Sequence, residues 1–328
     1  MNSQKSNLVR ISLFLVIFIL FAATFASANV HLPHIFSDNM VLQRDKDLPI
    51  WGWADSGEKI TIEFAGKSTT AAADENGAWQ TKLPPAKPGG PFVMTIKGNN
   101  SIQIKNILVG DVWLCSGQSN MEWPLVGATN AAKEIADSNY PQIRILTVPK
   151  RTAGLPKIDC DIEWKICGPE TAYAFSAVGY FFGREIYKEI NVPVGLINSS
   201  WGGSRIEPWT PSEGFALTEK TQNILKHIQD ADSIYRKNLE NSLDSLQDWL
   251  TKTKQALADN KQLPPQIDIP KHPLDDYSQP TGVYNSMIYP LKPFAICGAI
   301  WYQGEANLDD GMLYLEKMKA LVGGWRKI

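Results

Sequence analysis

The chain has 328 residues, of which 44% are hydrophobic and 20% are charged, and its formal net charge is -2 at pH 7. This composition is typical of a soluble globular protein. No cluster of lysine or arginine is present, so we exclude a nucleic-acid partner. At about 150 residues per domain, the length suggests two domains.

The first stretch of the chain is predicted to be a signal peptide. Lys5 and Arg10 precede an apolar run over residues 11–25, and Ala26-Ser27-Ala28 follows as a small-residue cleavage site. The alternative is an N-terminal membrane anchor, because the apolar run is nearly long enough to span a bilayer. We expect cleavage after this site, no stable membrane anchor afterwards, and a periplasmic or extracellular location.

Residues 29–106 are predicted to form a β-sandwich domain. Short alternating runs are separated by turn signals, among them Asn76-Gly77, which is typical of a hairpin. Strands are expected at residues 48–53, 59–64, 78–83, 92–97 and 101–107. Strands at this spacing indicate a sandwich. The domain either binds carbohydrate or serves as a structural partner, and the lack of an obvious row of aromatic residues favours the structural role.

Residues 107–328 are predicted to form an α/β domain with a parallel three-layer sheet. Apolar strands are expected at residues 107–115, 143–148, 194–198 and 295–302. Between two of them, a helix is expected from the N-cap Ser176 to Ile190, because apolar residues recur there every four positions. Strand, helix and strand in this order favour a doubly wound fold.

A helical insertion is expected at about residues 211–280. Apolar residues recur at helical spacing from about residue 221 to residue 257, which predicts one amphipathic helix or two, packed by one stripe on the body. A partner-binding helix is the alternative. The Pro-rich segment after it is expected to return to the sheet as a loop.

Three of the predicted strands end in loops of small and polar residues. These loops contain Ser119, Gly202-Gly203 and Gln303. The carboxyl ends of parallel strands meet at one edge of the sheet, where ligands bind. A serine hydroxyl is a potential nucleophile, a glycine loop lets a backbone N–H approach closely, and a glutamine supplies a side-chain N–H. Loop-capping roles are the alternative, but three such loops together favour acyl transfer.

The residues around these loops resemble three sequence blocks of the sialate O-acetylesterases, a branch of the SGNH (GDSL-like) hydrolases. The first block is GDVWLCSGQSNMEW at 110–123, the second is SSWGGSRIEPW at 199–209, and the third combines YNSMIYPL at 284–291 with GAIWYQGEAN at 298–307. Met121 replaces the second glycine of a G-x-S-x-G elbow, so the chain does not match the α/β-hydrolases. The resemblance implies an SGNH-type (flavodoxin-like) fold.

The resemblance also implies the roles of individual residues. Ser119 is the expected nucleophile, and the N–H groups of Ser119 and Gly203 are expected to hold the oxyanion. Gln303 stands where many SGNH hydrolases have an asparagine, so it is expected as the third oxyanion donor. Glu305 is expected to order its loop rather than to react. No cofactor is implied, and no CxxC or HExxH spacing suggests a metal site.

The sequence lacks the Asp-x-x-His block that carries the general base in this family. The chain has four histidines, and none of them completes that motif. His272 precedes a proline, as the family's histidine often does, but Ile269 lies three places before it, and it precedes the third block rather than following it. We therefore expect the catalytic His and Asp to be absent and the α/β domain to be incomplete at its C-terminus. A Ser119-dependent activity that uses His272 is the alternative.

The four cysteines leave the disulfide pattern open, because an exported protein can form disulfides. Cys160 and Cys167 are close enough for a local disulfide, although the sequence assigns no pairs. Cys115 and Cys297 lie in predicted apolar strands, so we expect them to be buried free thiols.

The sequence therefore predicts a carbohydrate O-acetylesterase that acts through an acyl-enzyme on Ser119. The expected substrate, on resemblance alone, is an O-acetylated sialic acid. An acetylesterase of xylan or another plant polysaccharide is the alternative within the same class. An inactive truncated fragment is the alternative from a different class.

Overall fold

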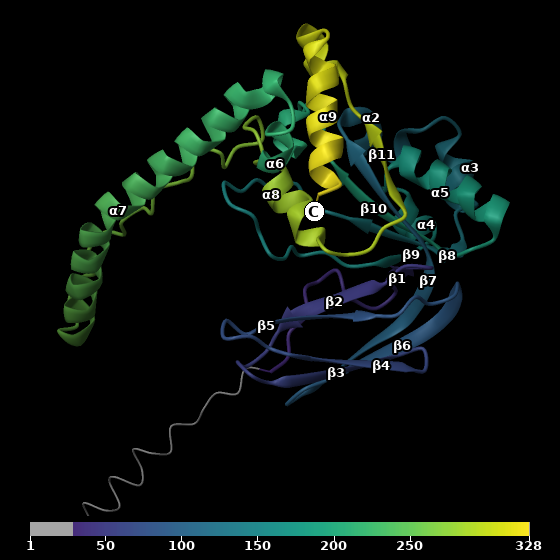
Figure 1. Cartoon of the computed structure of the whole chain (residues 1–328), viewed down its shortest axis with the longest axis horizontal. Coiled ribbons are helices and arrows are strands. Elements are labelled where there is room, and N and C mark those ends of the chain that lie inside the picture. Colours follow the sequence, from purple (N-terminus) through teal and green to yellow (C-terminus); the bar gives the residue numbers. More distant parts are fainter. Residues whose placement is uncertain (1–28, 328) are drawn as a thin grey trace, which may run out of the picture.

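A computed structural model describes residues 29–327 of the chain (Figure 1). The predicted signal peptide lies outside these described residues. Among the helices of residues 29–327, none combines the length and the apolar character that a membrane span requires.

The first region is built from two sheets whose strands are antiparallel, except that β1 pairs parallel with β7. One sheet runs in the order β4-β3-β6-β7, and the other pairs β2 with β5. The bounds are β1 Val41–Gln43, β2 Leu48–Trp53, β3 Lys59–Phe64, β4 Lys67–Ala72, β5 Ala78–Leu83, β6 Gly89–Lys97 and β7 Ser101–Gly117. In β3, Ile60, Ile62 and Phe64 are buried while Lys59 and Glu63 are exposed. This alternation gives one face to the core between the sheets and the other to water.

Two strands of the first region, β1 and β4, were not expected from the sequence. β4 has the sequence KSTTAA and contains no buried residue. It pairs antiparallel with β3 at the edge of its sheet. Because it buries no apolar face, it carries none of the alternation by which the other strands are recognised.

β7 belongs to both regions of the structure. Its first half pairs antiparallel with β6, and its second half pairs parallel with β10 and β11. Asn106 lies between the two halves with a φ of +56°. The boundary expected at residues 106–107 therefore falls inside a continuous strand and not in a linker.

The second region is an α/β sheet, and its parallel strands confirm the predicted class. The strands run in the order β11-β7-β10-β8, with the antiparallel β9 beside β8. The bounds are β8 Tyr140–Thr147, β9 Lys165–Cys167, β10 Val194–Ser200 and β11 Gly298–Tyr302. Among the described residues, β11 pairs only with β7, so it forms an edge of this sheet.

Helices cover both faces of the α/β sheet (Figure 1). Cys115 of β7 and Leu196 of β10 share a buried cluster with Tyr180 of α5. Their neighbours along the same strands, Leu114 and Ile197, belong to the cluster on the other face. The helix bounds are α2 Ser119–Glu122, α3 Ala131–Ala136, α4 Pro169–Ala172, α5 Ala177–Ile190, α6 Ser212–Phe215, α7 Gln222–Ala258, α8 Tyr284–Met287 and α9 Leu313–Trp325.

The predicted ends of α5 are confirmed. The Ser176 hydroxyl accepts a hydrogen bond from the N–H of Gly179, as an N-cap does. At the other end Asn191 adopts φ of +48° and its N–H bonds to the Tyr187 carbonyl, which closes the helix.

α7 is one continuous helix, and it extends away from the sheet (Figure 1). Ala231 is its buried residue, whereas Ile234, Leu243 and Leu257 are all more than half exposed. The expectation that its apolar stripe packs on the body is therefore wrong for most of its length. The helix projects past the body after its first turns, and the segment after residue 258 runs back beside it.

Candidate active site

The three loops singled out in the sequence meet at one edge of the α/β sheet. β7, β10 and β11 are adjacent and parallel, and the pairing aligns Gly117 with both Ser200 and Tyr302. The strands therefore end side by side, and the predicted convergence of their loops is confirmed. Backbone hydrogen bonds continue past the strand ends: the Gln118 N–H donates to Tyr302 O at 2.9 Å, and the Trp201 N–H donates to Gly117 O at 3.0 Å.

Gly117 makes this junction possible. Its φ is +144°, and a Cβ at this position would lie 2.1 Å from the Tyr302 carbonyl oxygen. Any side chain would therefore push β11 away from β7. The glycine allows the chain to turn directly out of the strand into α2, which begins at Ser119.

Ser119 presents an unengaged hydroxyl at the start of α2. The residue is exposed, and among residues 29–327 its Oγ has no hydrogen-bond partner. Its backbone N–H, in the first turn of the helix, also finds no acceptor in the described part of the chain. The hydroxyl and the N–H are thus both free to meet a ligand.

The loop after β10 brings a second free N–H beside Ser119. A Cβ on Gly202 would lie 3.5 Å from the Ser119 Cβ, so the two backbones are in close contact. Gly203 is exposed, with φ of +76°. Within the described residues its N–H has no acceptor. The N–H groups of Ser119 and Gly203 are therefore both unengaged, and their role as oxyanion donors stays a prediction.

Glu122 holds this loop in place, a contact that the sequence analysis did not identify. Its carboxylate accepts the Gly202 N–H through Oε2 at 2.5 Å and pairs with Lys150 through Oε1. Glu122 lies three residues after Ser119, so both side chains emerge from one turn of α2. The Gly202 N–H is consequently occupied, which leaves Gly203 as the free donor of the loop.

Gln303 is turned into the interior. Its side-chain amide donates to the Ser204 carbonyl at 3.1 Å and to Asn307 Oδ1 at 2.7 Å, and its Oε1 accepts from the Tyr314 hydroxyl. Both amide hydrogens therefore have acceptors, and the side chain joins the loops after β10 and β11. A role as oxyanion donor remains a prediction, and it requires that one of these hydrogen bonds be exchanged for the substrate.

Glu305 contacts the residue next to the serine. Its Oε1 accepts a hydrogen bond from the Asn120 side chain at 2.6 Å. A contact of this kind is what a loop-ordering role requires, because it ties the loop after β11 to the first turn of α2.

A charged network lies beneath the two loops, and no motif in the sequence points to it. Lys317 of α9 contacts Glu207 at 2.5 Å and Asp310 at 2.7 Å, and Asn307 donates to both carboxylates. Burial favours the neutral form of Glu207, but the hydrogen bonds from Lys317 and Asn307 outweigh it and lower its pKa. The pKa of Asp310 is lowered in the same way. The network fixes the β10 loop to the segment that follows β11.

None of the four histidines accompanies Ser119. His34 Nδ1 lies 2.6 Å from Asp159 Oδ2, and His227 Nε2 lies 2.9 Å from Gln279 Oε1. His31 forms a backbone bridge to Trp53 in the first region. All four histidines are within the described residues, and no hydrogen bond or ion pair joins any of them to the serine.

His272 is occupied elsewhere. Its Nδ1 accepts the Leu274 N–H, its ring lies 4.6 Å from that of Tyr235, and its Nε2 is 3.7 Å from Asp232. The side chain is buried beneath α7. The alternative in which His272 serves as the base of Ser119 finds no support in this placement.

The cysteines correct one expectation. All four are free thiols, and Cys115 is buried as expected. Burial raises the pKa values of Cys115, Cys160 and Cys167 to about 12. Cys297, however, is exposed, because β11 begins only at Gly298 and lies at the sheet edge. Within residues 29–327 no group of three or more His, Cys, Asp or Glu side chains could hold a metal ion.

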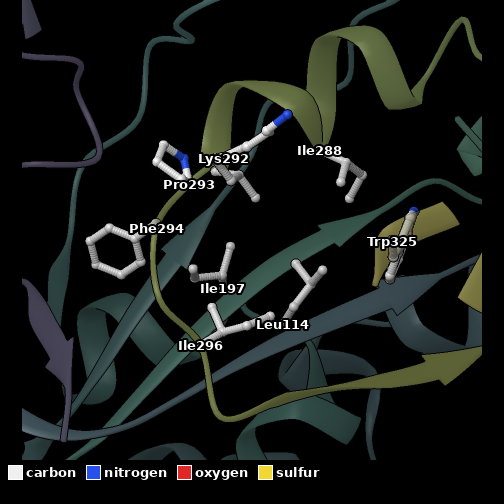
Figure 2. Close-up of a pocket in the computed structure, with 9 residues that line it drawn as sticks. Leu114, Ile197, Ile288, Lys292, Pro293, Phe294, Ile296 and Trp325 are labelled. Carbon is white, nitrogen blue, oxygen red and sulfur yellow. The ribbon is translucent and has the colours of Figure 1, made fainter. Parts of the chain in front are cut away.

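An apolar cavity lies on the face of the sheet covered by α8 and α9. Its volume is about 190 Å³. Figure 2 shows its lining, which is formed by Leu114, Ile197, Ile288, Leu291, Lys292, Pro293, Phe294, Ile296 and Trp325. The lining contains no serine, threonine or cysteine, so this cavity does not compete with the Ser119 edge as a site of acyl transfer through a hydroxyl or a thiol.

Comparison with known proteins supports the resemblance found in the motifs. Residues 109–243 match the family described as carbohydrate esterase, sialic acid-specific acetylesterase. The sialate O-acetylesterases of Rattus norvegicus and Homo sapiens are each 30% identical to this chain, over 315 and 331 residues. These matches cover 89% and 94% of this chain but 55% of each relative, so the chain spans about half the length of these relatives.

A solved structure shares the fold. The crystal structure of a carbohydrate acetylesterase from Xanthomonas citri superimposes with a TM-score of 0.70 and 35% sequence identity, covering 91% of this chain and 57% of that one. The α/β class and the resemblance in the three sequence blocks are both confirmed by these matches.

Proposed function

We propose that this chain, which is related to the sialate O-acetylesterases over most of its length, supplies the nucleophile and the oxyanion donors of a carbohydrate O-acetylesterase. One observation carries the proposal. The exposed, unengaged hydroxyl of Ser119 lies beside two free N–H groups, its own and that of Gly203, where three parallel strands end. A nucleophile next to preorganised donors is the arrangement that acyl transfer requires.

In this reaction the Ser119 oxygen attacks the carbonyl carbon of an acetyl ester. A general base takes the hydroxyl proton as the new C–O bond forms, and the carbonyl oxygen becomes an oxyanion held by the N–H groups of Ser119 and Gly203. The sugar oxygen then leaves with the proton, which forms an acetyl-enzyme. Water attacks the acetyl group by the same steps, and acetate and free serine result.

The general base of this proposal is not one of the four histidines of the sequence, because each of them has other contacts. We assign it to an Asp-x-x-His segment outside residues 29–327. The length of the relatives supports this assignment, since nearly half of each relative lies outside the match.

We propose an O-acetylated sialic acid as the substrate. The names of the relatives support this choice, and so does an exposed arginine that follows Lys150 in the chain. Lys150 pairs with Glu122 beside Gly202. The neighbouring Arg151 is exposed, and no acidic side chain of the described residues pairs with it. A free guanidinium suits the carboxylate of an acidic sugar. Acetylated xylan has no carboxylate on its xylose units, so it serves as the contrasting substrate.

The test is acetate release by the protein encoded by the whole open reading frame, with the Ser119→Ala variant beside it. We expect release from O-acetylated sialic acid, at least about 10³-fold slower in the variant because the nucleophile is lost. Ser56→Ala is the control, since Ser56 is exposed in a turn of the first region. Equal release by Ser119→Ala, or none by the unmodified protein, would overturn the proposal. Release from acetylated xylan alone would overturn only the choice of sugar.

We also propose that the protein is exported and cleaved after Ala28. The charged start, apolar run and small-residue site of residues 1–28 support this. Sequencing the N-terminus of the protein purified from its host tests the proposal: a start at Asn29 is expected, and a retained Met1 would contradict it.

A further inference from the structure

Two aromatic rings stack on each other beside the Ser119 site. The ring centroids of Trp201 and Tyr277 are 5.8 Å apart, and the ring planes differ by 24°. Trp201 immediately precedes Gly202, whose backbone touches Ser119, and its own N–H bonds to Gly117. Tyr277 comes from the segment that returns after α7. Two distant parts of the sequence are thus joined at the edge of the site.

The segment that carries Tyr277 is held by a turn within itself and by two contacts with other elements. The Asp276 carboxylate accepts hydrogen bonds from the N–H and the hydroxyl of Ser278, at 2.9 and 2.6 Å. The next residue, Gln279, contacts His227 of α7. The Thr281 N–H donates to the Glu207 carbonyl at 3.1 Å. These contacts hold the tyrosine in position before any ligand arrives, so binding orders few additional groups.

The stacked pair has one protected ring and one open ring. Trp201 is half-buried and packs against the core. Tyr277 lies over it but remains 46% exposed. A residue whose purpose was only to cover Trp201 would bury its own ring, whereas Tyr277 leaves a large apolar surface in water. Because Trp201 directly precedes the glycines of the loop beside Ser119, the open ring that stacks on it is placed where a ligand of the site can contact it.

We propose that the exposed face of Tyr277, supported by Trp201, is a platform on which the sugar ring of the substrate stacks while its acetyl group reaches Ser119. A pyranose has apolar C–H faces, and a rigid aromatic ring buries such a face at little cost in side-chain entropy. The residues next to Tyr277 in the chain, Asp276, Ser278 and Gln279, are polar and can hydrogen-bond to hydroxyl groups of a sugar. The segment that returns from α7 thus takes part in selecting the sugar. This inference rests on the proposed esterase function.

The first experiment compares a sugar ester with an ester that has no sugar. Tyr277→Ala and Tyr277→Phe are made in the protein encoded by the whole reading frame. We expect Tyr277→Ala to lower kcat/KM for O-acetylated sialic acid about tenfold or more, mainly through KM, and to lower kcat/KM for ethyl acetate, which has no ring to stack, far less. Tyr277→Phe keeps the ring and is expected to retain the activity. Tyr173→Ala is the control, because Tyr173 is similarly exposed but lies at the end of α4.

Comparing the two esters distinguishes a sugar-binding role of Tyr277 from a purely structural one. An equal loss on both esters would show that Tyr277 only supports the fold of the site, and it would overturn the proposal. No loss on the sugar ester would also overturn it.

The second experiment does not depend on catalysis. Saturation-transfer NMR on the Ser119→Ala protein measures binding of two probes, the methyl glycoside of N-acetylneuraminic acid and xylobiose. Binding of either sugar that Tyr277→Ala abolishes and Tyr277→Phe retains supports the platform, even if no ester is hydrolysed. No binding of either sugar, or binding that survives Tyr277→Ala, overturns it. Failure of the esterase function and failure of the platform are therefore distinguishable.

Discussion

The reactive polar groups at the edge of the sheet lack hydrogen-bond partners among residues 29–327, whereas the polar groups in the interior just beneath it have them. At the edge, Ser119 and Gly203 leave a hydroxyl and N–H groups without partners in the described chain. Beneath them, Lys317 lies between Glu207 and Asp310, and the amide of Gln303 has a partner at every hydrogen. The difference shows how reactive groups can remain without partners. The buried network holds the backbone of the loops in place, so the exposed hydroxyl and N–H groups need no contacts of their own.

The largest effect on stability is expected from breaking the interior network. Lys317→Met would remove the buried cation that lies between Glu207 and Asp310, because the Lys317 side chain is only 5% exposed. Among the described residues, both carboxylates would keep the more exposed Arg205 alone as a cationic partner. We expect the free energy of unfolding to fall by about 3 kcal/mol or more, as for other broken buried ion pairs. Chemical denaturation measures this change.

Lys319→Met is the matched control for this prediction. Lys319 is on the same helix and pairs with Glu316 at the surface. We expect its loss to change the free energy of unfolding by less than about 0.5 kcal/mol. Equal changes in the free energy of unfolding for the two substitutions would show that the buried network stabilises the fold no more than a surface ion pair does.

The second largest effect is expected on kcat, from a substitution of Glu122, which joins the loop at the edge of the sheet to α2. Glu122→Ala removes the acceptor of the Gly202 N–H, so the oxyanion loop loses its anchor. We expect kcat of the whole-frame protein to fall about 10- to 100-fold, in line with the roughly 1.5–3 kcal/mol typical of hydrogen bonds to a charged group. Glu122→Gln retains an acceptor oxygen and is expected to recover most of kcat. Failure of Gln to do better than Ala would contradict the positioning role.

The effect of pH on stability is expected to be smaller than the effects of these substitutions. It depends on the buried network and not on the groups at the edge of the sheet. The pKa values of Glu207 and Asp310 are lowered from ordinary values of 4.5 and 3.8. The unfolded chain therefore takes up these protons at a higher pH than the folded chain does. The stabilisation is present above those ordinary values and is lost as pH falls through the lower pKa values of the folded protein.

Melting temperature measured between pH 7 and pH 3 tests this sign. It is expected to fall below about pH 4.5 as these carboxylates take up protons. The fall is expected to be shallower in Lys317→Met, which no longer stabilises the carboxylates. An identical slope in the variant would exclude the network as the source.

The smallest effect concerns the thiols. Cys115 lies on β7, four residues before Ser119, yet burial raises its pKa to about 12. Cys297 is exposed. Labelling with a maleimide at pH 7 is therefore expected to modify Cys297 first, the half-buried Cys160 more slowly, and Cys115 and Cys167 only after unfolding. Early modification of Cys115 would mean that the interior below the site is open.

The sequence predicted the parts of the site that depend on local patterns. Apolar runs that end in small residues located β7, β10 and β11, and the parallel sheet then brought Ser119 and Gly203 together. The same reasoning missed β4, which buries no residue, and expected Cys297 to be buried because it could not show that β11 lies at an edge.

Contacts between distant residues could not be predicted in this way. Glu122 meets Gly202, 80 residues away, and Lys317 meets Glu207, 110 residues away. Nothing in the spacing of these residues distinguishes them from other surface charges. Gln303 shows the same limit: its motif predicts a donor, but only the structure places Ser204 and Asn307 where they accept its hydrogens.

The most direct test of the account is covalent labelling of the proposed nucleophile. The protein encoded by the whole reading frame is treated with a fluorophosphonate, digested and analysed by mass spectrometry. We predict a single adduct on the peptide that contains Ser119, which disappears in Ser119→Ala and remains in Ser56→Ala. An adduct on another residue, or no adduct at all, would contradict the claim that Ser119 is the nucleophile.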